Sequence, residues 1–562
     1  MRKIGERYEN WLLSVRAPEE KSELLRMDEA TKSDAFFTEL SFGTGGLRGI
    51  MAMGTNRMNR YTVAKATRGL CRYILTEFPS NKSVAIGYDS RNNSELFAKL
   101  AASILASAGV RVHLWPELLP TPMLSYAVRT LGCSVGIMLT ASHNPGEYNG
   151  YKVYGADGCQ ITEEAAEIIS RHIAEQPTFT DEEPEDFDKL LANGKISYIG
   201  EDVYEAFIQE IMANSVLGTD CTENASLKIV YTPLNGTGRR PVTDVLSRCG
   251  FKNVHVVREQ EMPDGNFPTC PYPNPEIKEA MALGVSYAEK MGADVLLATD
   301  PDCDRVGVGT PGPDGRYTLL TGNEIGLLLF DFIAKRLTED GTMPKHPIVV
   351  KTVVTSDLTD RIAQRFGVTV KNVLTGFKYI GETIGALEKA GHVEDYILGF
   401  EESCGYLTAG YVRDKDGVLA AMLIAELAAY HRANGKTLYE AICELYKTYG
   451  YAKNSLKSYA FTGPQGFADM QGVMQRLRGG VNAFGKYAVE DVLDYAKGID
   501  SLPASDVLKF LLAGGSTLTV RPSGTEPKLK VYFSVSARDS AEASETTEQL
   551  TAQIEEIIYQ TK

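Results

Sequence analysis

The sequence predicts an α/β protein, because strand patterns alternate with helix patterns along most of its 562 residues. Short apolar runs typical of buried strands are separated by amphipathic segments of helical length. This spacing favours β-α-β units with parallel or mixed sheets. The alternation passes through three rounds of similar length. From Gly417 onward the pattern changes to two long helices, a β-rich segment and a closing helix at 541–558.

Each round predicts its own set of elements. In the first we expect strands at 84–88, 110–115 and 135–139 and a helix at 163–175. In the second we expect strands at 228–231, 254–257 and 295–298, with helices at 242–249 and 277–291. In the third we expect strands at 348–353, 368–373 and 396–400, with helices at 356–366 and 377–390. At roughly 150 residues per domain the length suggests three or four domains, and we place boundaries near 215, 325 and 445.

Composition and charge exclude several classes of protein. The net charge is −15 and the pI about 5.2, which argues against a nucleic-acid-binding surface, so any bound anion needs a local cluster of cations. The longest apolar run, 418–429, contains Glu426 and is too short to span a bilayer. The start of the chain has no apolar signal region, and the nine cysteines form no C-x-x-C pair. We therefore expect a cytoplasmic monomer or weak homodimer without nucleic-acid or membrane partners.

The residues that follow each strand are the first place to search, because ligands of α/β sheets bind beyond the carboxyl ends of the strands. The first such stretch reads Leu139-Thr140-Ala141-Ser142-His143 and continues Asn-Pro-Gly. Ser142 is either an ordinary turn residue or a nucleophile displayed at the end of a strand. It is not a hydrolase nucleophile elbow, because the G-x-S-x-G pattern is absent.

A second stretch, Thr299-Asp300-Pro301-Asp302-Cys303-Asp304-Arg305, follows the strand at 295–298. Three carboxylates at a spacing of two can converge on one hard cation such as Mg²⁺, which prefers oxygen ligands. A calcium EF-hand loop is excluded, because its sixth position would be Arg305 instead of Gly and its twelfth Pro311 instead of Glu. An exposed acidic turn is the alternative. The metal interpretation is favoured, since three clustered aspartates repel one another without a cation.

Two further stretches have ligand-binding chemistry. Glu401-Glu402-Ser403 follows the strand at 396–400 and offers the acceptors and donors that sugar hydroxyls need. The run Arg521-Pro522-Ser523-Gly524-Thr525 offers a planar guanidinium, two hydroxyls and free backbone N–H groups, which suit a phosphate. Surface residues and an ordinary turn are the respective alternatives.

Two other glycine-rich stretches are excluded as nucleotide-binding motifs. The stretch at 43–48 has Arg48 where a dinucleotide fingerprint needs its third glycine. The stretch at 435–437 lacks the first glycine of a P-loop, because Tyr430 occupies that position.

Taken together, these stretches resemble the α-D-phosphohexomutase superfamily. The T-A-S-H-N-P, D-x-D-x-D-R, G-x-E-x-S and R-P-S-G-T-E-P motifs occur in the family's order, and with the F-G-T-G-G-L-R-G motif they span 43–530. The resemblance implies three α/β domains and a smaller, mobile α+β domain around a central cleft. We therefore expect α/β domains carrying the serine loop at 1–215, the metal loop at 216–325 and the sugar loop at 326–445, and a phosphate-binding domain at 446–562.

The resemblance also implies roles for single residues. Ser142 would carry a phosphoryl group, and together with Asp300, Asp302 and Asp304 it would bind one Mg²⁺ per chain. Arg48, His143 and Lys152 match catalytic or neighbouring positions, with either Lys152 or His143 relaying the hydroxyl proton. Substrate binding would involve the following residues: Arg305, Gly376, Lys378, Glu401, Ser403, Arg521, Ser523, Gly524 and Thr525.

The activity that this resemblance implies is a phosphoglucomutase, which interconverts glucose 1-phosphate and glucose 6-phosphate. Glucose 1,6-bisphosphate would be both intermediate and activator. A phosphoserine makes chemical sense here, because direct migration of phosphate between O1 and O6 is sterically blocked. Phosphomannomutase, pentose-phosphate mutase and hexose-bisphosphate synthase are alternatives within the class.

Two alternatives lie outside that class. One is a catalytically inactive phosphosugar-binding scaffold, and the other is a phosphosugar-binding or phosphatase-like protein. A scaffold has no reason to keep three mutually repelling aspartates. A phosphatase-like protein has no reason for both a carrier serine and a second phosphate cradle.

Overall fold

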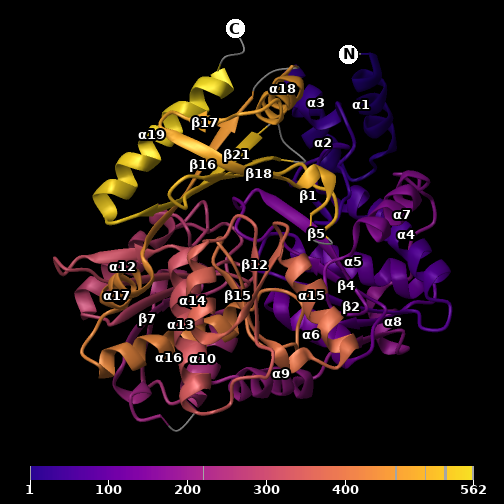
Figure 1. The fold of residues 1–562 in the computed structure, drawn as a ribbon. Helices are drawn as coiled ribbons and strands as arrows, with labels where there is room; N and C mark the ends of the chain where they lie inside the picture. The colour runs from indigo at the N-terminus through magenta and orange to yellow at the C-terminus, as the bar shows by residue number, and fades with distance from the viewer. Residues whose placement is uncertain (1, 219–220, 462–464, 500–501, 524–527, 560–562) are drawn as a thin grey trace.

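The computed structural model describes residues 2–218, 221–461, 465–499, 502–523 and 528–559. It contains four sheets that follow one another along the chain. The three predicted α/β rounds each supply one mixed sheet. The C-terminal region supplies an antiparallel sheet, which stands as a separate layer with its yellow helix in Figure 1.

The first sheet has the order β1-β5-β4-β2-β3-β6. Its strands are β1 (Leu47–Ile50), β2 (Ser83–Tyr88), β3 (Arg111–Leu114), β4 (Val135–Leu139), β5 (Tyr148–Gly155) and β6 (Ile196–Tyr198). The central strands β2 and β4 are buried throughout, which explains their continuous apolar runs. β5 runs antiparallel to both β4 and β1, so the chain returns across the sheet after the serine loop.

Helices flank this sheet and precede it. They are α4 (Arg60–Glu77), α5 (Ser94–Ser107), α6 (Thr121–Thr130), α7 (Glu163–Ala174), α8 (Phe187–Ala192) and α9 (Glu201–Ala213). Three short helices, α1 (Arg2–Ser14), α2 (Pro18–Arg26) and α3 (Glu29–Phe36), come before β1. They have a small core of their own in which Trp11 and Phe36 make an edge-to-face contact.

The second sheet has the order β11-β10-β9-β7-β8. Its strands are β7 (Lys228–Thr232), β8 (Asn253–Val256), β9 (Val295–Thr299), β10 (Val306–Pro311) and β11 (Tyr317–Leu320), with helices α10 (Arg239–Arg248), α11 (Arg258–Glu261) and α12 (Lys278–Met291). β9 and β10 form a hairpin around the aspartate-rich loop.

The third sheet has the order β13-β12-β14-β15. Its strands are β12 (Ile348–Thr352), β13 (Thr369–Val373), β14 (Tyr396–Glu401) and β15 (Gly405–Leu407), with helices α13 (Gly322–Glu339), α14 (Leu358–Phe366) and α15 (Phe377–Ala390). The two long helices predicted after Gly417 are α16 (Gly417–Ala433) and α17 (Leu438–Tyr449). α16 is buried on nearly every face and belongs to the core shared by the first three sheets, which explains its apolar sequence.

The C-terminal sheet has the order β16-β21-β20-β19-β18-β17, and all its pairings are antiparallel. Its strands are β16 (Tyr451–Ala460), β17 (Ala483–Phe484), β18 (Tyr487–Asp494), β19 (Leu508–Leu512), β20 (Thr517–Pro522) and β21 (Lys528–Ala537), packed against α18 (Gly466–Arg478) and α19 (Ser540–Tyr559). The predicted fold class is therefore confirmed, whereas the boundaries near 215, 325 and 445 stay predictions. Among the described residues, no helix has the length and apolarity needed to cross a membrane.

Candidate active site

The serine loop connects β4 to β5, and a buried arginine holds it in place. Arg91 donates to the carbonyl oxygens of Ser142 at 2.5 Å, Pro145 at 2.8 Å and Tyr148 at 3.0 Å, and also to that of Asn144. Ser142 has φ 53°, in the left-handed region that costs a non-glycine residue about 1–3 kcal/mol. The arginine contacts hold the loop in this conformation.

The hydroxyl of Ser142 faces the aspartate-rich loop of the second sheet. Its Oγ donates to Asp300 Oδ2 at 2.9 Å, and it lies 3.2 Å from His143 Nδ1. Removal of water around His143 lowers its pKa well below the ordinary value, and the charges of Arg305 and Arg48 lower it further. His143 is therefore a neutral imidazole at neutral pH.

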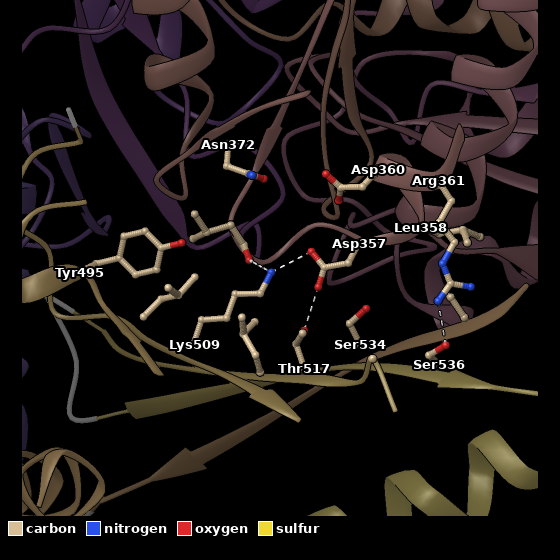
Figure 2. Close-up of a pocket in the computed structure, with 15 residues that line it drawn as sticks. Asp357, Leu358, Asp360, Arg361, Asn372, Tyr495, Lys509, Thr517, Ser534 and Ser536 are labelled. Atoms are coloured by element: carbon tan, nitrogen blue, oxygen red, sulfur yellow. Dashed lines mark hydrogen bonds and ion pairs between the residues drawn. The ribbon is translucent and has the colours of Figure 1, made fainter. Parts of the chain in front are cut away.

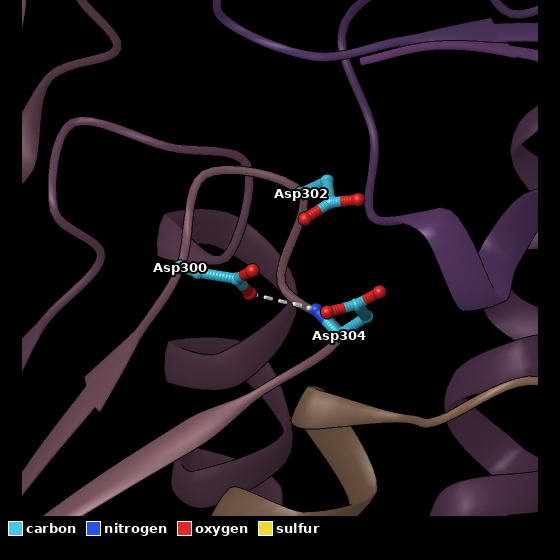
Figure 3. Close-up of side chains that lie close together, drawn as sticks. All are labelled: Asp300, Asp302 and Asp304. Carbon is cyan, nitrogen blue, oxygen red and sulfur yellow. Dashed lines mark hydrogen bonds between the residues drawn. The ribbon is translucent and has the colours of Figure 1, made fainter. Parts of the chain in front are cut away.

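Asp300, Asp302 and Asp304 follow β9, and their side chains converge (Figure 3). One oxygen of each lies within 4.8 Å of the others, and all three residues are buried. The backbone N–H groups of Asp304 and Arg305 both donate to Asp300 Oδ1 at 3.1 Å, which closes the loop on itself. Asp302 Oδ1 and Asp304 Oδ1 are buried and have no hydrogen-bond partner.

Burial and neighbouring charges shift the pKa values of Asp300 and Asp302 in opposite directions. Burial raises the pKa of Asp300 well above its ordinary value, and the charges of Asp304 and Asp302 raise it further. Burial would raise the pKa of Asp302 too, but the ion pair with Lys152 lowers it below its usual range. Three carboxylates in one dry site thus need more positive charge than Lys152 alone supplies.

Two lysines from different domains reach the aspartates. Lys152 on β5 places Nζ 2.8 Å from Asp302 Oδ2 and 3.8 Å from Asp304 Oδ2. Lys415, just before α16, places Nζ 3.1 Å from Asp304 Oδ2. Residues from the first three domains therefore meet at this point.

The aspartate triad suits a hard divalent cation. Its two unpartnered buried oxygens would be costly without a positive ligand, and carboxylates are the donors that such ions prefer. Ser142 Oγ, already at hydrogen-bond distance from Asp300, would face the same ion. The donor set fits a divalent ion.

The structure also brings together the predicted sugar-binding loops of the third domain. The N–H of Gly376 donates to Glu401 Oε1 at 3.0 Å, and Gly376 has φ 123°, which favours glycine. Ser403 lies in the turn between β14 and β15. Lys378 Nζ lies 3.6 Å from Glu163 Oε1 on α7, so this loop reaches back to the first domain.

Two cations near the aspartates complete this region. Arg48 on β1 donates to Asn144 Oδ1 at 3.2 Å, within the serine loop. Arg305 forms an ion pair with Glu276, and its Nε lies 3.9 Å from Asp300 Oδ2 and 3.8 Å from Asp304 Oδ1. Both guanidinium groups therefore lie beside the serine loop and the aspartate triad.

The predicted phosphate loop lies at the end of β20. The guanidinium of Arg521 lies near the phenol groups of Tyr532 and Tyr379, and Tyr379 is next to the Gly376 loop. The N–H of Ser523 donates to the carbonyl of Lys528 at 2.7 Å and closes the loop. Gly524 and Thr525 lie outside the described residues.

Protein-family models match all four regions that carry these loops. Four successive models match, described as phosphoglucomutase/phosphomannomutase alpha/beta/alpha domains I, II and III and C-terminal domain, over 39–179, 205–312, 321–449 and 473–553. The chain belongs to the α-D-phosphohexomutase family. It is an enzyme of the isomerase class, and the family binds phosphosugars.

Curated relatives agree over nearly the full length. The chain is 36% identical to a phosphoglucomutase from Staphylococcus saprophyticus, over 96% of this chain and 98% of the relative. It is 37% identical to a phosphoglucomutase from Staphylococcus haemolyticus, over 92% and 93%. Among solved structures, the phosphoglucomutase parafusin from Paramecium, in an open form, shares the fold with a TM-score of 0.69 at 18% identity, over 93% of this chain and 96% of that one.

Sequence reasoning missed three residues that this phosphohexomutase uses to build the site. Arg91 holds the serine loop, Thr121 donates to Asp302 Oδ2 at 2.9 Å, and Lys415 pairs with Asp304. Arg91 follows β2 closely, so the rule of examining strand ends could have found it. Thr121 and Lys415 follow no predicted strand and carry no local signal of their own.

Proposed function

We propose that this phosphohexomutase is a phosphoglucomutase that interconverts glucose 1-phosphate and glucose 6-phosphate through phosphoserine at Ser142. The observation that carries the proposal is the 2.9 Å hydrogen bond from Ser142 Oγ to Asp300, beside two carboxylate oxygens that lack a hydrogen-bond partner. The names of the staphylococcal relatives favour glucose as the sugar.

Mg²⁺ is the proposed resident ion, one per chain, held by Ser142, Asp300, Asp302 and Asp304. It would neutralise the negative charge that develops on the phosphoryl group during transfer. Lys152 and Lys415 hold Asp302 and Asp304 from outside the triad and keep their oxygens aimed inward.

In the proposed reaction, a hydroxyl of the sugar attacks the phosphorus of phosphoserine 142. The bond between the phosphorus and Ser142 Oγ breaks as the new bond to the sugar oxygen forms. His143 or Lys152 takes the proton of the attacking hydroxyl. The neutral state of His143 suits it to accept that proton, whereas Lys152 is held in an ion pair with Asp302.

The product of that step is glucose 1,6-bisphosphate, which must turn around before the second transfer. Glu401, Ser403 and the Gly376–Lys378 loop would bind the sugar hydroxyls. Arg521, Ser523, Gly524 and Thr525 would bind the phosphate that is not reacting, and Arg305, beside Asp300 and Asp304, would bind the substrate at the reacting end. Charge-assisted hydrogen bonds from arginine suit this task. The reverse transfer returns a phosphoryl group to Ser142.

We place this reaction in the cytoplasm. All nine cysteines lie among the described residues as free thiols, which supports a reducing compartment.

The test is a mutase assay with a trace of sugar bisphosphate, combined with the intact mass of the protein. The proposal expects conversion of glucose 1-phosphate in preference to mannose 1-phosphate and ribose 1-phosphate, and a mass increase of one phosphoryl group. Preference for mannose or ribose phosphate would reassign the substrate. Absence of turnover with all three would favour a binding scaffold.

A further inference from the structure

A half-buried carboxylate joins the C-terminal domain to the third domain. Asp357, between β12 and α14, accepts from Lys509 Nζ on β19 at 2.7 Å and from Thr517 Oγ1 on β20 at 2.9 Å. Its own domain supplies Lys351 Nζ at 3.1 Å. Figure 2 shows the side chains of Asp357, Lys509 and Thr517 converging from both sides of the contact. We call the four residues Lys351, Asp357, Lys509 and Thr517 the latch.

The contact around the latch is not a continuous core. An apolar cluster joins Val353, Val354 and Leu374 of the third domain to Tyr495, Val507 and Tyr532 of the C-terminal domain. Beside it lies a cavity of about 340 Å³, lined by Asp357, Lys509 and Thr517 of the latch and by Arg361 and Tyr495 among others (Figure 2). An interdomain contact that is partly polar permits one domain to move on the other.

The latch and the phosphate loop share one strand. Thr517 begins β20, and Arg521 lies four residues further along it. The Cα atoms of these two residues are therefore about 13 Å apart along the strand. β20 is paired along its length with β21 and over 517–520 with β19, so it behaves as a rigid element. A shift at Thr517 therefore moves Arg521.

The other side of the latch is equally rigid. Asp357 follows β12, and β12 pairs with β14, whose last residue is Glu401. Thr352, at the end of β12, donates to Glu402 Oε2 at 3.3 Å. The latch thus connects the end of the third-domain sheet that carries the sugar loop to β20, the strand that carries Arg521.

We propose that Asp357 is a positioning residue: through Lys509 and Thr517 it sets the distance between Arg521 and the sugar loop, and so positions the phosphate that is not reacting. This inference rests on the proposed function. It predicts that the latch acts on substrate binding and on retention of the bisphosphate, and leaves phosphoryl transfer at Ser142 unaffected.

Lys509→Met is the sharpest variant, because Lys351 remains to pair with Asp357 and the third domain keeps its own charge balance. Thr517→Val removes only one hydroxyl and guards against misfolding of the first variant. Lys509→Arg keeps the charge. Lys453→Met is the matched control, because Lys453 Nζ bonds to Ser544 Oγ inside the C-terminal domain.

Three measurements on full-length protein decide the matter: KM for glucose 1-phosphate, the rate of Ser142 phosphorylation by saturating glucose 1,6-bisphosphate, and the radius of gyration by X-ray scattering. We expect Lys509→Met to raise KM about tenfold, to enlarge the radius of gyration, and to leave the phosphorylation rate as in the wild type. Lys509→Arg and Lys453→Met should resemble the wild type.

A double-mutant cycle tests whether the latch acts through Arg521. In an Arg521→Ala background, Lys509→Met should raise KM no further, because the group it positions is gone. Additive effects, or an unchanged KM in both Lys509→Met and Thr517→Val, would overturn the proposal. If the wild type lacked activity on glucose phosphates, only the proposed function would be refuted. The scattering measurement would then test the latch by itself: an unchanged radius of gyration in Lys509→Met would refute the latch as well.

Discussion

Lys152 Nζ lies 2.8 Å from Asp302 Oδ2, so an ion pair between residues 150 positions apart joins the sheet of the serine loop to the loop of the aspartate triad. Both side chains are buried. The pair holds Ser142 opposite Asp300, because β5 continues directly from the serine loop and Asp302 lies in the loop that begins at Asp300.

Replacing Lys152 by Met should therefore damage both catalysis and stability. We expect kcat to fall by roughly 10²- to 10⁴-fold, since a proton-transfer group is lost, and the free energy of unfolding to fall by about 3–5 kcal/mol, since Asp302 is left uncompensated. Steady-state kinetics and urea unfolding measure the two effects. Lys436→Met, which breaks an exposed pair with Glu444, is the control and should change neither.

Removal of divalent metal, or Asp302→Asn, should impair phosphoryl transfer more than sugar binding. The triad would lose the ion that its unpartnered oxygens suit, and we expect kcat to fall on the order of 10²- to 10³-fold. Calorimetric titration with glucose 1-phosphate should give nearly the wild-type Kd. Full activity after exhaustive chelation would refute a role for the ion.

Arg521→Ala should weaken phosphosugar binding and release the intermediate. One charge-assisted hydrogen bond is worth about 1.5–3 kcal/mol, so we expect KM to rise roughly ten- to a hundredfold. The variant should also need more added glucose 1,6-bisphosphate, while Ser142 remains phosphorylatable. Loss of Ser142 phosphorylation with an unchanged KM would show that this loop is not the distal phosphate site.

Much of the site was predictable because its chemistry sits at strand ends. Ser142 and the three aspartates follow β4 and β9 directly, so inspection of each strand and the residues after it finds them. The motifs also indicated the family, since their types and order are more specific together than separately.

The rest was not predictable, because it depends on contacts between distant residues. Lys415 pairs with Asp304 from another domain, and Lys509 reaches Asp357 across 152 positions. No local periodicity encodes such pairs. The three helices at the N-terminus were likewise outside the alternating pattern, and the antiparallel return of β5 depends on pairing that a single strand pattern does not specify.

Stability should depend on pH through Glu426. This carboxylate on α16 accepts from the N–H of Val216 at 2.8 Å and from Ser215 Oγ, and burial raises its pKa to about 7. Between pH 4.5 and about 7 the folded state holds a proton that the unfolded state releases. The free energy of unfolding therefore falls as the pH rises through this window, by at most roughly 1.4 kcal/mol per pH unit.

Glu426→Gln should flatten that part of the stability profile. The amide is neutral at every pH and keeps an acceptor for Val216. Urea unfolding at several pH values between 4.5 and about 7 measures the slope. An identical slope in the variant would assign the pH dependence to another group.

The central claim is that Ser142 donates the phosphoryl group, and a single-turnover experiment tests it most directly. The enzyme is phosphorylated with glucose 1,6-bisphosphate carrying labelled phosphorus, freed of sugar, and mixed with unlabelled glucose 1-phosphate. The wild type should lose the label from the peptide that contains Ser142 and deliver it to glucose 1,6-bisphosphate. Ser142→Ala should take up no label while melting at the wild-type Tm. Label that stays on Ser142 during turnover, or near-wild-type turnover by Ser142→Ala, would contradict the mechanism.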